Sequence, residues 1–120
     1  MSVLKTFERD VLDRLAAGAL SAEQIEAVAS EGTFVSYEYT GSGYFLTLAH
    51  PSLPKERTVC SRPAIMGHAD DIDCGFVIFI ENGELMLECH TWGEIDVPED
   101  FRSRSVKLED VTAKVSYGDN

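Results

Sequence analysis

The stretch GFVIFIE-NG-ELMLECH, residues 75–90, decides the fold of this 120-residue chain. Asn82-Gly83 between two apolar runs is the strongest short-range indication of a β-hairpin, because a type I′ turn needs positive φ at both central residues. The run before the turn is apolar on both faces, so it is expected to be a central strand. The run after it alternates, with Leu85, Leu87 and Cys89 inward, which leaves one face of the sheet for solvent or a partner.

Two short helices are expected before this hairpin. The apolar residues of segment 4–15 recur at helical spacing, and Gly18 ends that segment. Residues 21–24, Ser-Ala-Glu-Gln, have the capping-box pattern of a second helix start, and Gly32 is placed to end that helix. About three residues join the two segments, which predicts an αα-hairpin.

Further strands are expected on both sides of the central hairpin. Residues 33–40 alternate in polarity and predict a half-buried strand, followed by a Gly-Ser-Gly turn and a second strand over residues 44–49. Residues 58–60 are at most a short edge strand, before a loop that contains Gly and Asp. Residues 101–108 predict a last strand, and residues 109–115 fit either its extension or a short helix.

The expected fold is a single α+β domain over residues 1–116, followed by a C-terminal tail at 117–120. In this fold the N-terminal αα-hairpin packs on one face of a mostly antiparallel sheet of about five to six strands.

The chain has 21 acidic and 10 basic side chains and a formal net charge of −11. Direct nucleic-acid binding relies on clustered Lys and Arg, so nucleic acid is not an expected ligand. The longest apolar run has five residues, too few to span a membrane, and no membrane partner is expected. The N-terminus lacks the pattern of a secretory signal, and three widely spaced cysteines suit reduced thiols, so a cytoplasmic location is predicted.

The charge is concentrated in one third of the chain. Residues 63–101 contain ten carboxylates and no Lys or Arg, so the remainder nets only −1, which is −11 minus −10. Either this stretch is a solvated face that keeps the protein soluble, or it docks on a basic partner. The ten are Asp70, Asp71, Asp73, Glu81, Glu84, Glu88, Glu94, Asp96, Glu99 and Asp100.

Metal and cofactor sites are not expected. Residues 68–74 combine His68, Asp70, Asp71 and Asp73 with a thiol, but the EF-hand template fails because Gly75 and Asn82 fall at ligand positions. An acidic turn before a central strand explains the segment. A zinc site would need separate strands to converge, from the set Cys60, His68, Cys74 and His90.

Catalysis is less favoured than binding, and whether the chain is an enzyme stays open. The candidate nucleophiles are Cys60, Cys74 and Cys89, and the candidate bases are His50, His68 and His90. Adjacent residues on a strand point to opposite faces, so Cys89 and His90 cannot act as a pair. Cys89 falls in the inward set and is expected to pack as a small apolar residue.

Trp92 is the only tryptophan and follows the strand that ends the hairpin. One interpretation is that Trp92 folds back to cap the core while Pro98 shapes the loop. The other is an exposed aromatic anchor beside carboxylates such as Glu94 and Asp96, a composition typical of interaction hot spots.

Several motifs resemble those of a set of small uncharacterised bacterial proteins, over most of the chain up to about residue 101. These motifs are mostly turn glycines and core apolar residues, so the resemblance implies a shared fold and no activity. Small size, high acidity and one aromatic loop are also similar to toxin-neutralising immunity proteins and to phage inhibitors that imitate nucleic acid. The motifs are residues 7–12 (FERDVL), 39–45 (YTGSGYF), 75–79 (GFVIF), 82–85 (NGEL), 87–88 (LE), 91–94 (TWGE) and 98–99 (PE).

The leading hypothesis is a small acidic module of immunity or inhibitor type that docks on a basic protein, either a toxin or a nucleic-acid-binding protein. The alternative is a small-molecule-binding or enzymatic domain that uses the open sheet face around Tyr37, Met86, Glu88 and His90. A further alternative is a self-associating housekeeping domain, such as a homodimer. The partner-binding candidates are Trp92, Glu94, Asp96, Asp70, Asp71, Asp73, Glu88 and His90.

Overall fold

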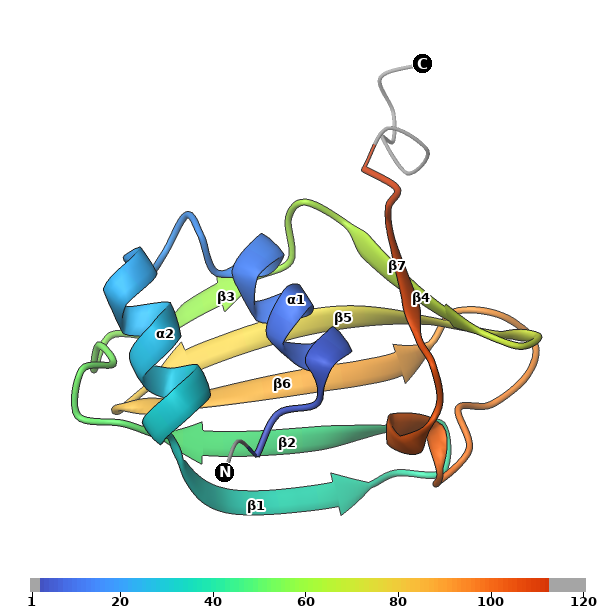
Figure 1. Cartoon of the computed structure of the whole chain (residues 1–120), viewed down its shortest axis with the longest axis horizontal. Helices are drawn as coiled ribbons and strands as arrows, with labels where there is room; N and C mark the ends of the chain where they lie inside the picture. Colours follow the sequence, from blue (N-terminus) through green and yellow to red (C-terminus); the bar gives the residue numbers. More distant parts are fainter. Residues whose placement is uncertain (1–2, 113–120) are drawn as a thin grey trace.

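The computed structural model describes residues 3–112 as an α+β fold, with two helices on one face of an open antiparallel sheet (Figure 1). The sheet has seven strands, rather than five or six, in the order β1-β2-β6-β5-β4-β7, and β3 pairs with β5. The elements are α1 (Thr6–Leu15), α2 (Ala22–Glu31), β1 (Thr33–Tyr39), β2 (Gly43–Ala49), β3 (Thr58–Cys60), β4 (Ile65–Ala69), β5 (Ile72–Glu81), β6 (Glu84–Thr91), the 3-10 helix η1 (Phe101–Ser103) and β7 (Lys107–Asp110).

The central hairpin is confirmed. Asn82 and Gly83 have φ of 56° and 77°, the positive values that a two-residue turn requires. β5 lies inside the sheet, with β6 along one edge and both β3 and β4 along the other. Leu85, Leu87 and Cys89 of β6 are buried on the face that the helices cover. The opposite face carries no helix (Figure 1), and we call it the outer face.

The two expected helices are present, but residues 16–21, rather than about three residues, join them. The Ser21 hydroxyl accepts a hydrogen bond from the Gln24 N–H (3.1 Å), and the Gln24 side chain accepts one from the Ser21 N–H (2.8 Å). Phe7, Val11 and Leu12 of α1 are buried, and α1 contacts α2, β5, β4 and β7. Neither helix of the described residues is long and apolar enough to cross a membrane.

The segment expected to be a loop before residue 75 contains strand β4 and the first residues of β5. The chain reverses between them at Asp70 and Asp71, and Asp70 adopts φ of 58°. β4 escapes prediction because its inward position 67 is glycine. A Cβ there would lie only 3.0 Å from the Phe76 ring, so packing requires a residue that weakens the strand pattern.

The prediction of one strand over residues 101–108 is wrong. The Phe101 N–H donates to the Pro98 carbonyl (3.0 Å), and η1 carries the fully buried Phe101 ring into the core. β7 begins only at Lys107 and runs to Asp110, which agrees with a strand at the start of the ambiguous segment. The rest of that segment and the expected tail at 117–120 lie outside the described residues.

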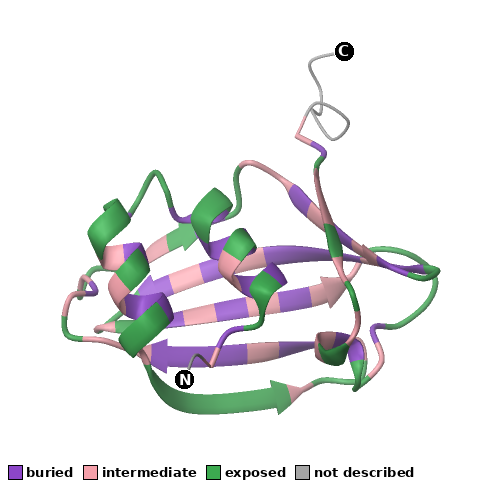
Figure 2. Ribbon diagram, viewed as in Figure 1, coloured by how far each residue is buried: buried purple, intermediate pink, exposed green. Residues whose placement is uncertain are grey.

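β1 is exposed, not half-buried as its alternation suggests (Figure 2). A bulge between Phe34 and Ser36 shifts the register, and Tyr37 lies opposite inward Leu46 on the helix side. Tyr37 therefore does not share the outer face with Met86, Glu88 and His90, which corrects the grouping expected for a small-molecule site.

Candidate functional site

The acidic turn between β4 and β5 and the loop that follows β6 lie at the same end of the sheet (Figure 1). They meet where the Trp92 N–H donates to the Asp73 carbonyl (2.9 Å). This end brings together Asp70 and Asp71 of the turn, Asp73 of β5, and Trp92, Glu94 and Asp96 of the loop. We call these residues the acidic end. Glu88 and His90 lie on β6, on the outer face of the sheet.

The loop over residues 92–100 is tied down on its inner side. The Thr91 hydroxyl donates to the Ile95 carbonyl (2.7 Å), and the Tyr39 hydroxyl of β1 donates to the Val97 carbonyl (2.8 Å). Val97 is fully buried. Hydrogen bonds therefore fix the backbone of the loop at residues 95 and 97, while the side chains of residues 94–96 are exposed.

Trp92 and Ile95 project from this loop with 43% and 45% of their surfaces exposed. The interpretation that Trp92 caps the core is therefore wrong; the fully buried side chains of this region are those of Val97 and Phe101. Glu94 and Asp96 are exposed beside the two apolar side chains. Ile95 thus lies between Glu94 and Asp96 in the exposed loop, and Trp92 lies two residues before Glu94.

Part of the acidic charge is neutralised within the fold. Arg104 pairs with Asp70 and with Asp100 (both 3.1 Å), and Arg57 pairs with Glu81 (3.4 Å). Arginines that flank the acidic stretch in sequence thus return to it in space. Within residues 3–112, no ion pair involves Asp71, Glu84, Glu88, Glu94, Asp96 or Glu99.

A small hollow of about 200 Å³ lies on the outer face beside Trp92. His90 and Trp92 lean over Gly75, since a Cβ at Gly75 would lie 2.8 Å from His90 Nε2 and 3.2 Å from Trp92 Cε3. Arg62 and Val77 also line the hollow, and none of its lining residues is a carboxylate. His90 Nδ1 is buried and has no hydrogen-bond partner among the described residues.

His68 joins three strands. Its Nδ1 lies 2.7 Å from Asp73 Oδ1 on β5, and its Nε2 lies 2.9 Å from Glu109 Oε1 on β7. The hydrogen bond to Asp73, aided by the one to Glu109, raises the pKa of His68. Both ring nitrogens are thus used, and residues 3–112 contain no group of three or more His, Cys, Asp or Glu side chains able to hold a metal ion.

The three cysteines are buried thiols. A hydrogen bond with Cys74 and burial both raise the pKa of Cys89, and burial raises the pKa of Cys60. Because the nucleophile of cysteine chemistry is the thiolate, these environments oppose catalysis at Cys60 and Cys89.

Ser52, His50 and Glu31 form an arrangement that resembles a catalytic triad. His50 Nδ1 lies 2.8 Å from Ser52 Oγ, and His50 Nε2 lies 3.1 Å from Glu31 Oε1. The Ser52 backbone N–H also donates to His50 Nδ1 (3.0 Å), so the single lone pair of that nitrogen is already used. His50 therefore cannot serve as the base for the Ser52 hydroxyl, and the group closes the turn after β2.

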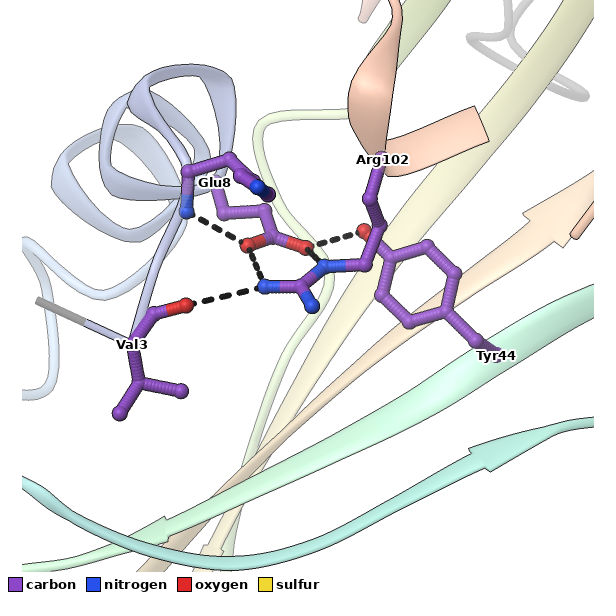
Figure 3. A network of polar contacts seen from close by, with 5 residues as sticks. Val3, Glu8, Tyr44 and Arg102 are labelled. Carbon is purple, nitrogen blue, oxygen red and sulfur yellow. Dashed lines mark hydrogen bonds and ion pairs between the residues drawn. The ribbon is translucent and has the colours of Figure 1, made fainter. Parts of the chain in front are cut away.

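A buried charge network that the sequence reasoning missed lies on the helix side of the sheet (Figure 3). Glu8 has no exposed surface, and Arg102 donates to both of its carboxylate oxygens (2.7 and 2.8 Å). The Tyr44 hydroxyl and the Lys5 N–H also donate to Glu8. Arg102 further donates to the Val3 carbonyl (3.0 Å).

This network is saturated. Four donors occupy the two Glu8 oxygens, and the Arg102 guanidinium lies over the rings of Tyr37 and Tyr44, 5.6 and 5.8 Å from their centroids. Burial, followed by the charge of Glu8, raises the pKa of Tyr44, so its hydroxyl stays protonated and donates. One indication of this network was available in the sequence, because Glu8 is an acidic residue within the apolar stripe of α1.

The chain matches no protein-family model, and no curated protein or solved structure shows significant similarity to it.

Proposed function

We propose that this chain is a small acidic protein-binding module, of the immunity or inhibitor type, that docks on a basic protein such as a toxin or a nucleic-acid-binding protein. The contact surface comprises the acidic end and the neighbouring outer face with Glu88 and His90. The observation that carries the proposal is the tied loop, which holds Trp92 and Ile95 outward while Val97 is fully buried.

A fixed loop lowers the cost of binding. Ordering a flexible loop and its side chains on association offsets part of the contact energy, and a preformed surface avoids that loss. Aromatic side chains dominate interaction hot spots, and surrounding residues that exclude water strengthen them. Trp92, with Ile95 three residues away, has both the exposure and the support for such an anchor.

The charges favour a basic partner. Glu88, Glu94 and Asp96 make no ion pair within the described residues, and the whole chain carries a formal charge of −11. Complementary charge accelerates association and disfavours wrong partners. A basic surface would gain most from these carboxylates, because no cation in residues 3–112 has neutralised them.

The hollow beside Trp92 supports a protein partner over a small-molecule ligand. Its volume of about 200 Å³ is below the range of about 300–1,000 Å³ that ligand pockets occupy. It also lacks the carboxylate beside His90 that acid–base chemistry would need. The hollow suits one side chain of a partner that docks next to Trp92.

The test begins with capture of partners by chemical cross-linking in cells, followed by calorimetry on the purified pair. Trp92→Ala is expected to weaken binding about 30-fold, which corresponds to a hot spot of about 2 kcal/mol. The double variant Glu94→Lys/Asp96→Lys is expected to weaken binding and to flatten its salt dependence, because the carboxylates that attract the basic surface are reversed.

A matched control is the double variant Asp10→Lys/Glu56→Lys, which makes the same change in net charge at exposed positions outside the proposed contact surface. Its affinity should stay close to that of the unmodified protein. If both double variants lost the same affinity, the loss would come from net charge and not from the contact surface. An unchanged affinity for Trp92→Ala would show that Trp92 does not anchor the partner.

A further inference from the structure

β1 is a second unpartnered feature, separate from the acidic end. It closes one side of the sheet, and within residues 3–112 no strand pairs with its outer edge. It has seven residues, whereas β7 at the opposite side has four. An edge strand presents backbone N–H and C=O groups that can pair with another strand.

The side chains of β1 are unusually apolar for an exposed edge. Three of the six large apolar side chains exposed in the described residues lie on it, namely Phe34, Val35 and Tyr37. Figure 2 shows β1 exposed beside the buried β2, and in Figure 1 neither helix lies over β1. Within the described residues, no helix covers the apolar side chains of β1.

β1 also lacks most of the features that protect edge strands. Residues 33–39 contain no Lys, Arg or Pro. Their one irregularity is the bulge between Phe34 and Ser36, and the pairing with β2 is regular from Ser36 to Tyr39. That regular half can accept another strand along its free edge.

We propose that two copies of this chain associate by antiparallel pairing of β1 with β1 of the second copy, with Tyr37 at the two-fold axis. Residues opposite each other across a strand pair share one face of the sheet. An axis at Tyr37 places Ser36 opposite Glu38 on the outer face. An axis at Glu38 would oppose two carboxylates, which is destabilising.

A second copy fits this edge better than a basic partner does. β1 carries a single charge, Glu38, so it offers little to select a basic surface. The two-fold supplies a strand of matching length and polarity from the chain itself. Tyr37 is already held, with its ring centroid 5.5 Å from that of Tyr44 and Arg102 over its face, so little ordering is needed.

This association has a characteristic salt dependence. A pairing about Tyr37 joins only residues 35–39 of the two β1 strands and is smaller than a standard interface, so we expect a weak dimer with a Kd on the order of 100 μM. Each copy carries a formal charge of −11, so the copies repel and added salt should strengthen the dimer. Binding of a basic partner at the acidic end weakens with salt, which separates the two proposals.

The test is sedimentation equilibrium over a wide concentration range, at about 0.05 and 0.5 M NaCl. Val35→Glu is expected to weaken the dimer at least 10-fold, because it places a carboxylate on the paired edge opposite Tyr39 of the second copy, where association would remove it from water. The control is Val59→Glu, since Val59 is an equally exposed strand valine (48% against 44%) on β3. Circular dichroism melting confirms that both variants fold.

Hydrogen exchange supplies a second measurement that does not depend on a variant. The amides of residues 36–39 should exchange more slowly as the concentration of unmodified protein rises. A monomer at every concentration, equal dimerisation of the two variants, or loss of the dimer in Val59→Glu alone would each overturn the proposal. The last result would place the contact on the outer face.

Discussion

The Glu8–Arg102 network and the acidic end use the same chemical groups with opposite outcomes. Each combines carboxylates, an arginine and an aromatic ring. At the network each Glu8 oxygen accepts two hydrogen bonds, and Glu8 itself has no exposed surface. At the acidic end Glu94 and Asp96 remain in water and Trp92 is 43% exposed. The degree of enclosure, not residue type, separates a structural group from an interaction surface.

The largest effect is expected when the enclosed region loses its cation. Arg102→Met leaves the Glu8 carboxylate buried with its charge uncompensated, which typically costs about 3–5 kcal/mol of unfolding free energy. Urea unfolding measures this loss. A loss of unfolding free energy below about 1 kcal/mol would contradict the difference between the two regions, because it would mean that water reaches Glu8 as it reaches Glu94.

The double variant Glu8→Leu/Arg102→Met sharpens the same point. Replacing both charges of a buried pair by apolar groups is often neutral or stabilising, so much of the stability lost in Arg102→Met should return. A double variant as unstable as Arg102→Met would assign the loss to packing around residue 102 instead of to the bare carboxylate.

A smaller effect is expected where the exposed loop is tied to the sheet. Tyr39→Phe removes the hydroxyl that donates to the Val97 carbonyl and should cost about 0.5–1.5 kcal/mol. Amides of residues 94–96 should then exchange faster with deuterium. Tyr37→Phe is the matched control, because the Tyr37 hydroxyl makes no hydrogen bond within the described part of the chain. Equal effects in the two variants would show that the loop does not depend on this bond.

The smallest effect concerns His68, which lies between the two extremes of enclosure, with 35% of its side chain exposed. Folding raises the pKa of His68 above its ordinary value of 6.5, so the protonated ring stabilises the fold fully below that value. This contribution is lost as pH rises through the higher folded pKa. The partners are exposed, so about 0.5 kcal/mol is expected.

Urea unfolding of the unmodified protein and of His68→Gln, at a pH below 6.5 and again well above it, checks this sign. The stability difference between the two proteins should be larger at the lower pH. A difference that grows with pH would mean that the neutral ring is the stabilising form.

Local sequence patterns predicted the parts of the fold that depend on local geometry. Asn82-Gly83 gives a turn because these residues tolerate positive φ, and Ser21 with Gln24 satisfies the donors of its own helix start. β4 was missed because its position 67 must be glycine to leave room for the Phe76 ring of the neighbouring strand β5. No local sequence pattern reveals that contact. The exposure of β1 depends likewise on where the helices lie.

The candidate site divides in the same way. Trp92 and its neighbouring carboxylates could be selected from sequence, because an isolated tryptophan among acids is visible there. The ties from Thr91 and Tyr39 that position the loop required the structure. Arg102 pairs with a residue 94 positions away, and Arg104 with one 34 positions away, so neither partner could be read from the flanking basic residues.

The distance in sequence between Glu8 and Arg102 also bears on when the domain can form during synthesis. A chain made at roughly 5–20 residues per second reaches position 102 about 5–20 s after position 8, since 94 residues separate them. Until then α1 carries a carboxylate without its cation on the face that must be buried, so docking of α1 on the sheet is unfavourable. The first helix to be made is therefore among the last to be locked in place, and the core closes only once the segment after the acidic loop has been translated.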